Sequence, residues 1–408
     1  MPKALIAGCG IAGPITAIAL QKAGIESEIF ESYAKSADAA GAFLTLAPNG
    51  IAALGVLGLD RTVHDISFPI ERMIFRNGSG RLLGEIATGA AAAGTALYNV
   101  KRADLYRALR DEAAGRGVEI RYGKQLSSVS RANNDRVVAT FSDGSSAAGE
   151  LLIGCDGVHS IVRRVVDPAA PAARYQPLLN VGGYARGVNN LGGAATFYMC
   201  FGARAFFGYA PAPDGSIYWF ANLPTPEEPS REILANIDSI EGKRRLLDLF
   251  WKDKIPAIEI IEATTDLRAP LPTYVLSSVP KLNRDRVVLL GDAAHAMSPS
   301  SGQGASMAIE DAVILAKCLR DLPVERALER YEALRRDRVE RVAAYGERSS
   351  AGKAAGPVGR VLRDLALPFV LRYLAAPGRL AWMYDYRIDW NEHESSSASA
   401  PRTVPALR

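Results

Sequence analysis

The order of apolar and polar residues along the chain predicts a βαβ unit at its start. The run "KALIAG" is short, continuously apolar and closed by glycine, which is typical of a parallel strand covered on both faces. "AGPITAIALQKAG" then places apolar residues at helical spacing, and Gly24 closes this predicted helix. "IESEIF" supplies the second strand, which ends at Glu31.

The middle of the chain has a different pattern of hydrophobic and turn-forming residues, which predicts antiparallel strands. From Ile70, "IERMIFR", "NGSG" and "RLLGEI" predict a hairpin with a glycine-rich turn. "RADLYRALRDEAAGRG" predicts a helix, and four strands follow it up to "ELLIGCDG". Residues 181–223 are again rich in strands, with "YAPAPDGSIYWF" as another hairpin. "VVLLGD" is again a short apolar run typical of a buried parallel strand. Amphipathic helices follow it to about Ser349.

This interleaving predicts an α/β fold with two domains and an appendage. A doubly wound, Rossmann-like domain alternates along the chain with an antiparallel-sheet domain, and helices follow at the C-terminal side. The doubly wound domain is expected at 1–67, 101–172 and 283–345, the sheet domain at 68–100 and 173–282, the C-terminal helices at 346–391, and a disordered tail at 392–408.

The composition is that of an ordinary globular enzyme. The 408 residues are 48% hydrophobic and 23% charged, and the mean hydropathy is +0.02. The net charge is only +4, and bases alternate with acids in "ERALERYEALRRDRVERV". This mixture favours a solvated helix face over a nucleic-acid surface.

Targeting and redox signals favour a cytoplasmic location. The N-terminus lacks the basic and apolar regions of a signal peptide. No run reaches the roughly 18 to 20 apolar residues of a membrane span. The nearest one, "LALPFVLRYLAAPGRLAW", is interrupted by Pro368 and Arg372, which favours short docking helices over a membrane-surface contact. The cysteines form no CxxC pair, which argues against zinc and disulfides and fits a reducing compartment: Cys9, Cys155, Cys200 and Cys318.

The turn after the first strand carries the spacing GxGxxG, at Gly8, Gly10 and Gly13. Gly8 permits a tight turn, Gly10 lets the backbone approach a pyrophosphate, and Gly13 lets helix and strand pack closely. The helix that starts at Ala12 would direct free N–H groups and its positive dipole end at the phosphates. Glu31 lies at the tip of the second strand, where a carboxylate can accept hydrogen bonds from a ribose diol. A turn without a ligand is the alternative, but strand, helix and distal acid together favour a dinucleotide.

The stretch "GDAAHAMSPSSGQG", residues 291–304, indicates which dinucleotide. Asp292 ends a buried strand, at the edge where open α/β sheets bind ligands, and can accept hydrogen bonds from ribityl hydroxyls. Gly302, Gln303 and Gly304 precede a helix and would present N–H groups where negative charge develops on a reduced flavin. A nicotinamide does not require such a site.

Three motifs together resemble the FAD-dependent aromatic hydroxylases, the single-component flavoprotein monooxygenases with the p-hydroxybenzoate hydroxylase fold. They are GxGxxG with Glu31, "GCDGVHSIVRR" at 154–164 and "GDAAHAMSPSSGQGASMAIEDA" at 291–312, in the family's order and spacing. The resemblance extends from residue 1 to about 345. It implies tightly but non-covalently bound FAD and NAD(P)H as a transient co-substrate. It further implies O2 activation through a flavin C4a-hydroperoxide that hydroxylates an aromatic or polycyclic small molecule.

The resemblance also implies roles for individual residues. Glu31 matches the adenosine-ribose ligand, Arg102 the arginine that pairs with the pyrophosphate, and Leu126 a backbone contact to adenine. Asp156 and Gly157 match the "DG" motif, whose acid lies close to the pyrophosphate and serves both FAD and NAD(P)H. Without the resemblance, Arg102 could equally be a surface helix arginine and "CDG" a turn at a strand end.

Further positions match the surroundings of the flavin ring. Gly41 and Ala42, in "GAFLTLAPNG", match the segment that lies against the ring, and Pro299 matches a proline whose carbonyl lies near flavin and substrate. His295 could be a base, but a histidine in such a turn is more often a structural hydrogen-bonding group, which the resemblance favours. No residue is predicted to be a catalytic acid or base.

Aromatic residues are concentrated on the predicted sheet between 197 and 220. If one face covers the flavin, it forms a dry, flat slot, although core packing is the default explanation for most of these rings. We predict that four positions of this sheet contact substrate: Phe197, Met199, Phe207 and Tyr209. A register error of one residue would exchange the faces.

Several alternatives stay open at this point. The same scaffold could carry out Baeyer–Villiger insertion, epoxidation or decarboxylative hydroxylation, or the chain could be a non-catalytic FAD protein that sequesters an intermediate. A flavin halogenase is less favoured, because "YWFANLP" lacks that family's second tryptophan. NADH and NADPH are not separated, nor are monomer and homodimer.

Overall fold

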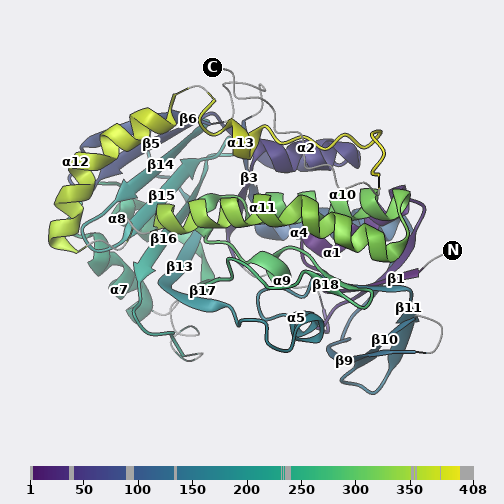
Figure 1. The fold of residues 1–408 in the computed structure, drawn as a ribbon. Helices are drawn as coiled ribbons and strands as arrows, with labels where there is room; N and C mark the ends of the chain where they lie inside the picture. The colour runs from purple at the N-terminus through teal and green to yellow at the C-terminus, as the bar shows by residue number, and fades with distance from the viewer. Residues whose placement is uncertain are drawn as a thin grey trace.

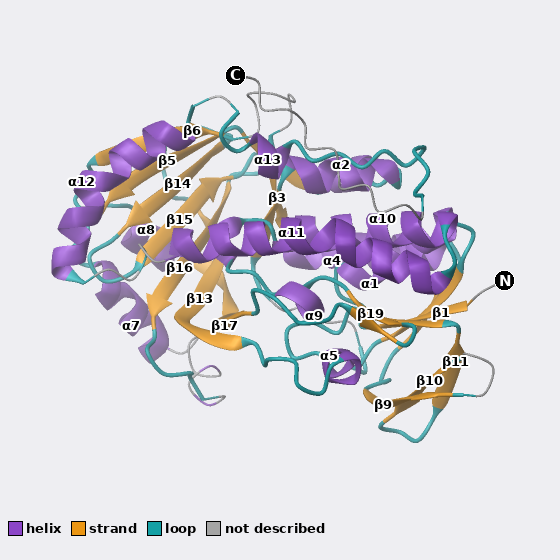
Figure 2. Cartoon of the chain, in the orientation of Figure 1, coloured by secondary structure: helices purple, strands orange, loops and turns teal. Residues whose placement is uncertain are grey.

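The computed structural model confirms the predicted α/β architecture with two interleaved domains and C-terminal helices (Figures 1 and 2). It describes residues 3–35, 41–88, 96–132, 136–230, 232, 234, 240–350, 353, 356–376 and 378–395. None of the helices within those ranges is long and apolar enough to cross a membrane.

The first domain is built on a six-stranded sheet of order β18-β19-β12-β1-β2-β8. Its central strands β1, β12 and β19 are short apolar runs that are almost entirely buried, and all neighbours are parallel except β18 and β19. The carboxyl ends of the parallel strands therefore meet at one edge. The strands are β1 (Lys3–Ala7), β2 (Glu26–Phe30), β8 (Glu119–Arg121), β12 (Leu151–Gly154), β18 (Asn283–Arg284) and β19 (Val287–Leu289).

Helices pack on this sheet through apolar faces. α1 (Ala12–Lys22) lies against α10 (Gly304–Asp321), and α10 lies against α11 (Val324–Ser350), as Figure 1 shows. The amphipathic pattern predicted to about Ser349 thus forms two consecutive helices. The remaining helices of this domain are α2 (Pro48–Val56), α3 (Asp60–His64), α4 (Arg102–Gly115), α5 (Ile161–Val166), α9 (Asp292–His295) and the 3₁₀ turn η1 (Pro299–Ser301).

Two small sheets flank the parallel one. β9 (Leu126–Arg131), β10 (Val137–Phe141) and β11 (Ser146–Gly149) form an antiparallel ladder, of which β11 was not predicted separately. β3 (Phe43–Leu46) and β4 (Ser67–Ile70) both pair with β7 (Leu97–Lys101). This second small sheet therefore contains strands from both sides of the predicted boundaries near residues 67 and 100.

The second domain is a seven-stranded sheet of order β17-β13-β16-β15-β14-β5-β6. All pairs are antiparallel except β14 and β5, and both predicted hairpins are present. α7 (Ile240–Phe250) and α8 (Ala257–Glu262) cover one face. The strands are β5 (Arg72–Asn77), β6 (Leu82–Ala87), β13 (Arg174–Arg186), β14 (Thr196–Phe201), β15 (Phe206–Pro211), β16 (Ser216–Pro224) and β17 (Thr264–Val275).

The C-terminal part returns across both domains. α12 (Pro357–Leu374) lies along β6 at the outer edge of the seven-stranded sheet, and α13 (Ala381–Tyr384) lies beside α2 (Figure 1). The chain beyond α13 is tied to the first domain, because Glu394 pairs with Lys317 at 3.0 Å and with Arg330 at 2.8 Å. Residues 396–408 of the predicted tail lie outside the described residues.

Candidate active site

The turn between β1 and α1 can be built only with glycine at two positions. Gly8 has φ +100°, and a Cβ there would lie 2.4 Å from the carbonyl oxygen of Cys155. A Cβ at Gly13 would lie 2.1 Å from the carbonyl oxygen of Gly8. α1 then begins without a side-chain cap or an acid in its first turn. Its unpaired N–H groups and positive dipole end therefore remain available to an anion.

Glu31 ties this turn to the end of β2. Its carboxylate accepts hydrogen bonds from the backbone N–H of Cys9 at 2.7 Å, from that of Tyr33 at 2.9 Å and from the Ser32 hydroxyl at 3.0 Å. A carboxylate offers about four acceptor positions, so these three bonds leave capacity for a ligand hydroxyl. The backbone N–H of Lys124 donates a hydrogen bond to the carbonyl oxygen of Glu31. Leu126, two residues after Lys124, therefore lies near the same end of β2.

Arg102 begins α4 and points to the same edge. Its backbone N–H binds the carbonyl oxygen of Ala42 at 3.0 Å, and its guanidinium donates to Tyr106 Oη at 3.1 Å. Its Nε is buried and has no hydrogen-bond partner. Burial lowers the pKa of Arg102, but Tyr106 and Asp292 together hold that pKa above its ordinary value. A cation with an unused, buried donor next to two glycine turns suits a phosphate.

Asp292 lies within the electrostatic reach of Arg102, at the start of α9. The surrounding protein raises the pKa of its carboxyl group, while His295 and Arg102 lower it. The side chain is nevertheless exposed. A carboxylate that is surrounded by protein and still meets solvent lies in a concavity, where a ligand hydroxyl can reach it.

The loop between α9 and α10 ends in an open, uncapped helix start. Ser298 Oγ accepts the N–H of Ser300 at the beginning of η1, where Pro299 lies. Gly302 closes η1 with φ +63°, a left-handed conformation that favours glycine. A Cβ at Gly302 or Gly304 would meet no atom within 4 Å. α10 then starts at Gly304 with no side-chain cap and no acid in its first turn.

A polar network that is buried except at Arg338 holds this loop from behind. Gln303, the residue before α10, receives a hydrogen bond from Asn49 on α2 at 2.9 Å, and Asn49 also donates to Glu310 at 2.7 Å. Glu310 pairs with Arg335 at 2.7 Å and with Arg338 at 2.7 Å, both on α11. The loop is therefore fixed through α10 to two other helices.

A second branch of the network holds Gly291. Asp311 accepts the N–H of Gly291 at 3.0 Å and pairs with Arg335 at 2.7 Å and with His295 Nε2 at 2.5 Å. Burial raises the pKa of Asp311, but His295 and Arg335 hold it well below its ordinary value. His295 therefore has the structural role that the sequence favoured. The sequence did not single out Asn49, Glu310, Asp311 or Arg335, although the adjacent acids of "IEDA" inside a helix expected to be buried were an available signal.

Asp156 and Gly157 lie at the same edge of the sheet, and the Asp156 side chain is bound to the start of α5. Asp156 accepts hydrogen bonds from Ser160 Oγ at 2.5 Å and from the N–H groups of Ile161 and Val162 at 2.7 and 3.1 Å. Burial raises its pKa even though these bonds lower it. Gly157 adopts φ +76° in the turn that follows. The carboxylate of the "DG" motif is thus engaged in capping α5.

Gly41 and Ala42 lie where the two domains meet. Gly41 adopts φ +73°, and a Cβ on it would lie 3.3 Å from Arg102. The Ala42 carbonyl oxygen also accepts a hydrogen bond from Tyr184 of β13 at 2.5 Å. A Cβ on Gly182, the neighbouring β13 position on that face, would approach Ala42 at 3.4 Å. This segment therefore separates the seven-stranded sheet from the start of α4.

The structure corrects the prediction that four residues share one substrate-facing surface. Phe197 and Met199 lie on the face of β14 that turns toward β3 and β4. Phe207 and Tyr209 lie on the opposite face, where Phe207 packs on Phe250 of α7 with ring centroids 5.3 Å apart. β15 pairs with β14 one residue out of phase with the expected alternation, since Phe207 faces Cys200 across the ladder. We therefore withdraw Phe207 and Tyr209 as substrate contacts.

The inner face of the sheet instead carries a different aromatic set. Phe43 of β3 lies 6.1 Å from Phe197, 5.4 Å from Tyr218 and 6.2 Å from Phe220, measured between ring centroids. These rings form an apolar wall between the two domains. Packing of the hydrophobic core accounts for part of this ring–ring contact. The wall differs from an ordinary core because polar groups lie at one of its ends.

A row of polar side chains lies at that end of the wall. Lys353 Nζ donates to Asn222 Oδ1 at 2.8 Å and lies 4.4 Å from the Phe206 ring centroid. Asn222 donates to Asn180, and Asn180 donates to Thr273 Oγ1 at 2.7 Å. Burial lowers the pKa of Lys353 to about 7. Sequence reasoning missed this row, because its members come from β13, β16, β17 and the segment after α11.

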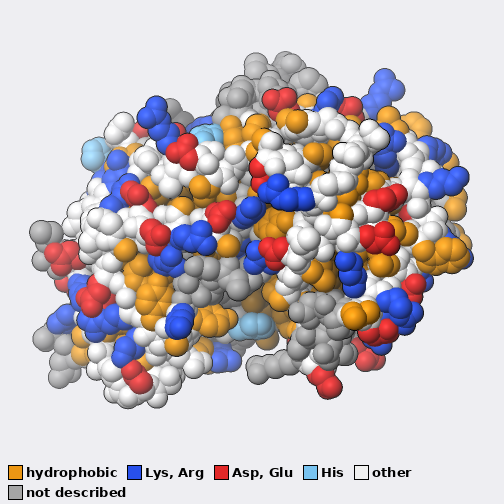
Figure 3. Space-filling view, turned by 180° about the vertical axis from the view of Figure 1, so that it is seen from behind, with side chains coloured by type: hydrophobic (Ala, Val, Ile, Leu, Met, Phe, Trp, Pro, Cys, Tyr) orange, Lys and Arg blue, Asp and Glu red, His pale blue; other side chains and the backbone are white. Residues whose placement is uncertain are grey.

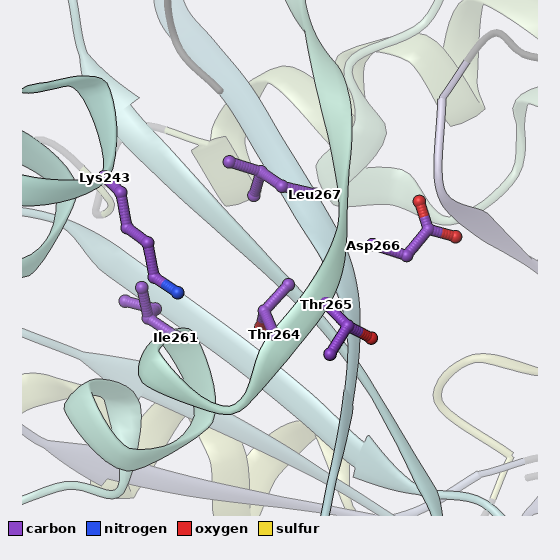
Figure 4. A pocket seen from close by; sticks show the side chains of 6 residues that line it. All are labelled: Lys243, Ile261, Thr264, Thr265, Asp266 and Leu267. Atoms are coloured by element: carbon purple, nitrogen blue, oxygen red, sulfur yellow. The ribbon is translucent and has the colours of Figure 1, made fainter. Parts of the chain in front are cut away.

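A separate depression of about 330 Å³ lies on the outer side of the seven-stranded sheet (Figure 4). It is lined by Lys243, Ile261 and Thr264 to Leu267, from α7, α8 and β17. Leu267 packs with the cluster under α7 and α8 rather than with the inner wall. The depression is therefore not part of the candidate active site.

The residues at the sheet edge fit an FAD molecule in two respects. Two helices, α1 and α10, begin there without caps, which leaves N–H groups for a pyrophosphate and for the electron-rich edge of a flavin. The buried, unpartnered Nε of Arg102 and the exposed carboxylate of Asp292 add one phosphate donor and one acceptor for hydroxyl groups. The open space at Gly302 and Gly304 leaves room for the ring.

Comparisons with known proteins agree with this geometry. The model of the FAD binding domain family matches residues 1–345. An FAD-dependent urate hydroxylase from Klebsiella pneumoniae subsp. pneumoniae is 31% identical over 343 residues, covering 83% of this chain and 86% of the relative. The aurachin C monooxygenase/isomerase from Stigmatella aurantiaca is 33% identical over 348 residues, covering 82% and 85%. The crystal structure of Klebsiella pneumoniae HpxO complexed with FAD and uric acid superposes with a TM-score of 0.82 at 27% identity, covering 92% of this chain and 96% of that one.

Proposed function

The chain belongs to the FAD binding domain family and is an FAD-dependent monooxygenase, and from this premise we propose that it hydroxylates an aromatic or polycyclic small molecule with NAD(P)H and O2. The balanced reaction consumes the substrate, NAD(P)H, a proton and O2, and yields the hydroxylated ring, NAD(P)⁺ and water. FAD, when bound, supplies the electron transfer and oxygen activation for this reaction.

The observation that carries the proposal is the cradle between α1 and α10, opposite an aromatic wall. Glu31 would bind the adenosine ribose, Arg102 the pyrophosphate and Asp292 the ribityl chain. The N–H groups at the start of α10 would stabilise negative charge on the flavin ring. Gly41, Ala42 and Pro299 would lie against that ring, on the side of the seven-stranded sheet.

The protein's own contribution is binding, orientation and exclusion of water. The wall of Phe43, Phe197, Tyr218 and Phe220 would hold a flat ring in a dry slot. The polar row at Lys353 and Asn222 would contact a polar or acidic group at one end of the substrate. Two relatives whose names specify urate and aurachin C as their compounds support a ring substrate of this general kind.

NAD(P)H is proposed to bind transiently. The sequence contains a single GxGxxG turn in a βαβ setting, so a second dinucleotide has no dedicated fingerprint of its own. The cofactor that reduces the flavin would then approach through a groove shared with FAD, beside the "DG" turn at Gly157.

Baeyer–Villiger insertion, epoxidation and decarboxylative hydroxylation remain the second candidates, because the same cradle and slot serve all of them. The names of the relatives favour oxygen insertion over non-catalytic sequestration of an intermediate, since each describes a hydroxylase or a monooxygenase.

The test is aerobic NADH or NADPH oxidation by the purified holoprotein against a panel of phenols, hydroxyquinolines and purines. We expect at least one ring compound to accelerate oxidation and to gain one oxygen atom from isotopically labelled O2. Accelerated oxidation without label in the product would show an uncoupled effector instead. No acceleration by any compound of the panel, with FAD bound, would contradict the proposed substrate class.

A further inference from the structure

The outer face of α12 is apolar and exposed. Of the twelve exposed large hydrophobic side chains in the described residues, seven lie on this one helix. Phe369 is 77% exposed and Val358 75%. Five of the seven follow one another at steps of three or four residues and so form a stripe along one side of the helix. The seven are Val358, Val361, Leu362, Leu365, Phe369, Val370 and Tyr373.

The helix cannot turn this stripe inward, because its other side is already packed. Leu371 is buried, and Leu367 and Leu374 pack with it against β6 and β14. A Cβ on Gly84 of β6 would lie 2.8 Å from Leu371, so the helix and the strand are in close contact. Asp364 accepts a hydrogen bond from Asn77 at 2.8 Å, which fixes the rotation of the helix.

Exposed positive charge lies at the C-terminal end of the stripe. Between residues 356 and 380 the chain carries four arginines and one acid, Asp364, which Arg363 neutralises at 2.7 Å. Arg372 and Arg379 are exposed beside Tyr373, and the Arg379 guanidinium lies 4.2 Å from the Tyr373 ring centroid. Figure 3, which is turned by 180° from Figure 1, shows hydrophobic and basic side chains side by side along its right edge, and this edge corresponds to the left side of Figure 1, where α12 lies.

An exposed tryptophan extends the same surface. Trp251 follows α7 and is 60% exposed, with Lys252 Nζ 4.7 Å from its ring centroid. Asp253 accepts the N–H of Ala203 at 3.0 Å, and the Ala203 carbonyl oxygen accepts a hydrogen bond from Arg360 of α12. This chain of contacts places the turn of Trp251 beside the beginning of α12.

We propose that α12 and the turn of Trp251 dock the protein on an anionic membrane surface. An apolar stripe flanked by basic residues, with tryptophan and tyrosine at its margins, is the combination that binds the interface between lipid headgroups and acyl chains. The contact is peripheral, because none of the helices in the described residues can span a bilayer.

A second copy of the chain suits this surface less well. In a two-fold contact through α12, each copy would bring Arg372 and Arg379 into an interface whose one acid from this segment, Asp364, is already paired with Arg363, so the added positive charge would oppose the pairing. An anionic surface instead neutralises the same charges while it buries the apolar stripe.

This inference goes beyond the proposed function and does not depend on it. The inner side of α12 shares its cluster with Phe220 of the aromatic wall and with Met199, which packs beside that wall. Docking would therefore bring one end of the wall toward the lipid, which suits a ring compound that partitions into membranes.

The experiment is flotation of the purified holoprotein with vesicles of phosphatidylcholine, alone or mixed with phosphatidylglycerol. We expect the wild type to float with the anionic vesicles and to be released by high salt. The double variant L365S/F369S should bind them at least about tenfold more weakly, because two large apolar side chains no longer enter the interface. Ile240→Ser, which removes an exposed apolar side chain of α7, should bind like the wild type.

FAD absorbance and the thermal midpoint of both variants establish that they are folded. If the wild type fails to bind anionic vesicles, or if L365S/F369S binds them as the wild type does, the inference is wrong. It is equally overturned if the wild type is a dimer that L365S/F369S converts to a monomer and neither binds vesicles, since the stripe would then be a self-association surface. Substrate turnover is not needed for any of these outcomes.

Discussion

Two neighbouring strands of the parallel sheet end in the same way, and the chain then uses the same residue type for opposite purposes. β12 is followed by Asp156 and β19 by Asp292, one position after Gly291. The Asp156 carboxylate accepts hydrogen bonds from three donors at the start of α5. Asp292 stays exposed, and the next long helix, α10, starts without any cap.

The position of an acid at the end of a buried strand therefore does not by itself reveal its function. Asp156 is followed within five residues by Ser160 and a helix that needs a cap. Asp292 instead begins the short helix α9, and the buried network around Arg335 holds both ends of that helix through Gly291 and His295. The buried network stabilises this region. The N–H groups at the start of α10 and the Asp292 carboxylate are therefore left available to a ligand.

The largest expected effect comes from breaking that network. Arg335→Met should lower the free energy of unfolding by about 3 to 5 kcal/mol, because Glu310 and Asp311 would keep buried charge with fewer partners. Urea denaturation of the apoprotein measures this loss. Arg348→Met, at an exposed position of the same helix, should change stability by no more than about 0.5 kcal/mol. Equal effects of the two substitutions would show that the network does not support the loop.

The next effect separates the two aspartates. Asp292→Ala should weaken FAD binding by about tenfold to a hundredfold, so that the protein purifies without colour, because an acceptor for the ribityl hydroxyls is lost. Its apoprotein should denature at nearly the same urea concentration as the wild type. Titration of the apoprotein with FAD measures the affinity. Normal FAD content in this variant would remove Asp292 from the cofactor site.

Asp156→Ala should show the reverse pattern. Losing the carboxylate that accepts the N–H groups of Ile161 and Val162 at the start of α5 should cost about 1 to 2 kcal/mol of stability, while the FAD affinity changes little. The same two measurements apply, so each aspartate is the control for the other. A colourless but stable Asp156→Ala protein would instead indicate a direct contact with the cofactor, as the motif resemblance implied.

The smallest effect should come from giving the start of α10 a carboxylate, as Asp156 provides at the start of α5. Gly304→Asp places an acid in the first turn of α10, where a Cβ meets no atom within 4 Å. The charge should stabilise the free helix end by about 0.3 to 1 kcal/mol and weaken FAD binding, because it occupies donors reserved for the flavin. Gly304→Asn separates charge from size. Unchanged FAD affinity in Gly304→Asp would mean that this helix start does not face the ring.

Much of the first domain could be predicted from sequence because its signals are local. Continuous apolar runs gave the parallel strands, and the glycines at 8 and 13 are required by contacts shorter than 3 Å that any Cβ would make. The aromatic wall could not be predicted equally well. Its membership depends on the register between β14 and β15, and one shifted residue moved Phe207 to the far face.

The buried network and the polar row escaped prediction for another reason. Arg335 is one of many arginines in a helix whose sequence predicts a solvated face, yet its side chain is fully buried. Lys353 contacts Asn222 although the two residues are 131 positions apart in the sequence. Such pairings are set by how whole elements pack, which no local pattern encodes.

The most direct test of the account is a crystal structure of the FAD-bound protein at a resolution that places the isoalloxazine. We predict hydrogen bonds from N–H groups at the start of α10 to the N1 and C2 carbonyl edge of the ring, and from a ribityl hydroxyl to the Asp292 carboxylate. A flavin whose ring contacts neither α10 nor the segment at Gly41 and Ala42 would contradict it, even if the adenosine still lay against Glu31.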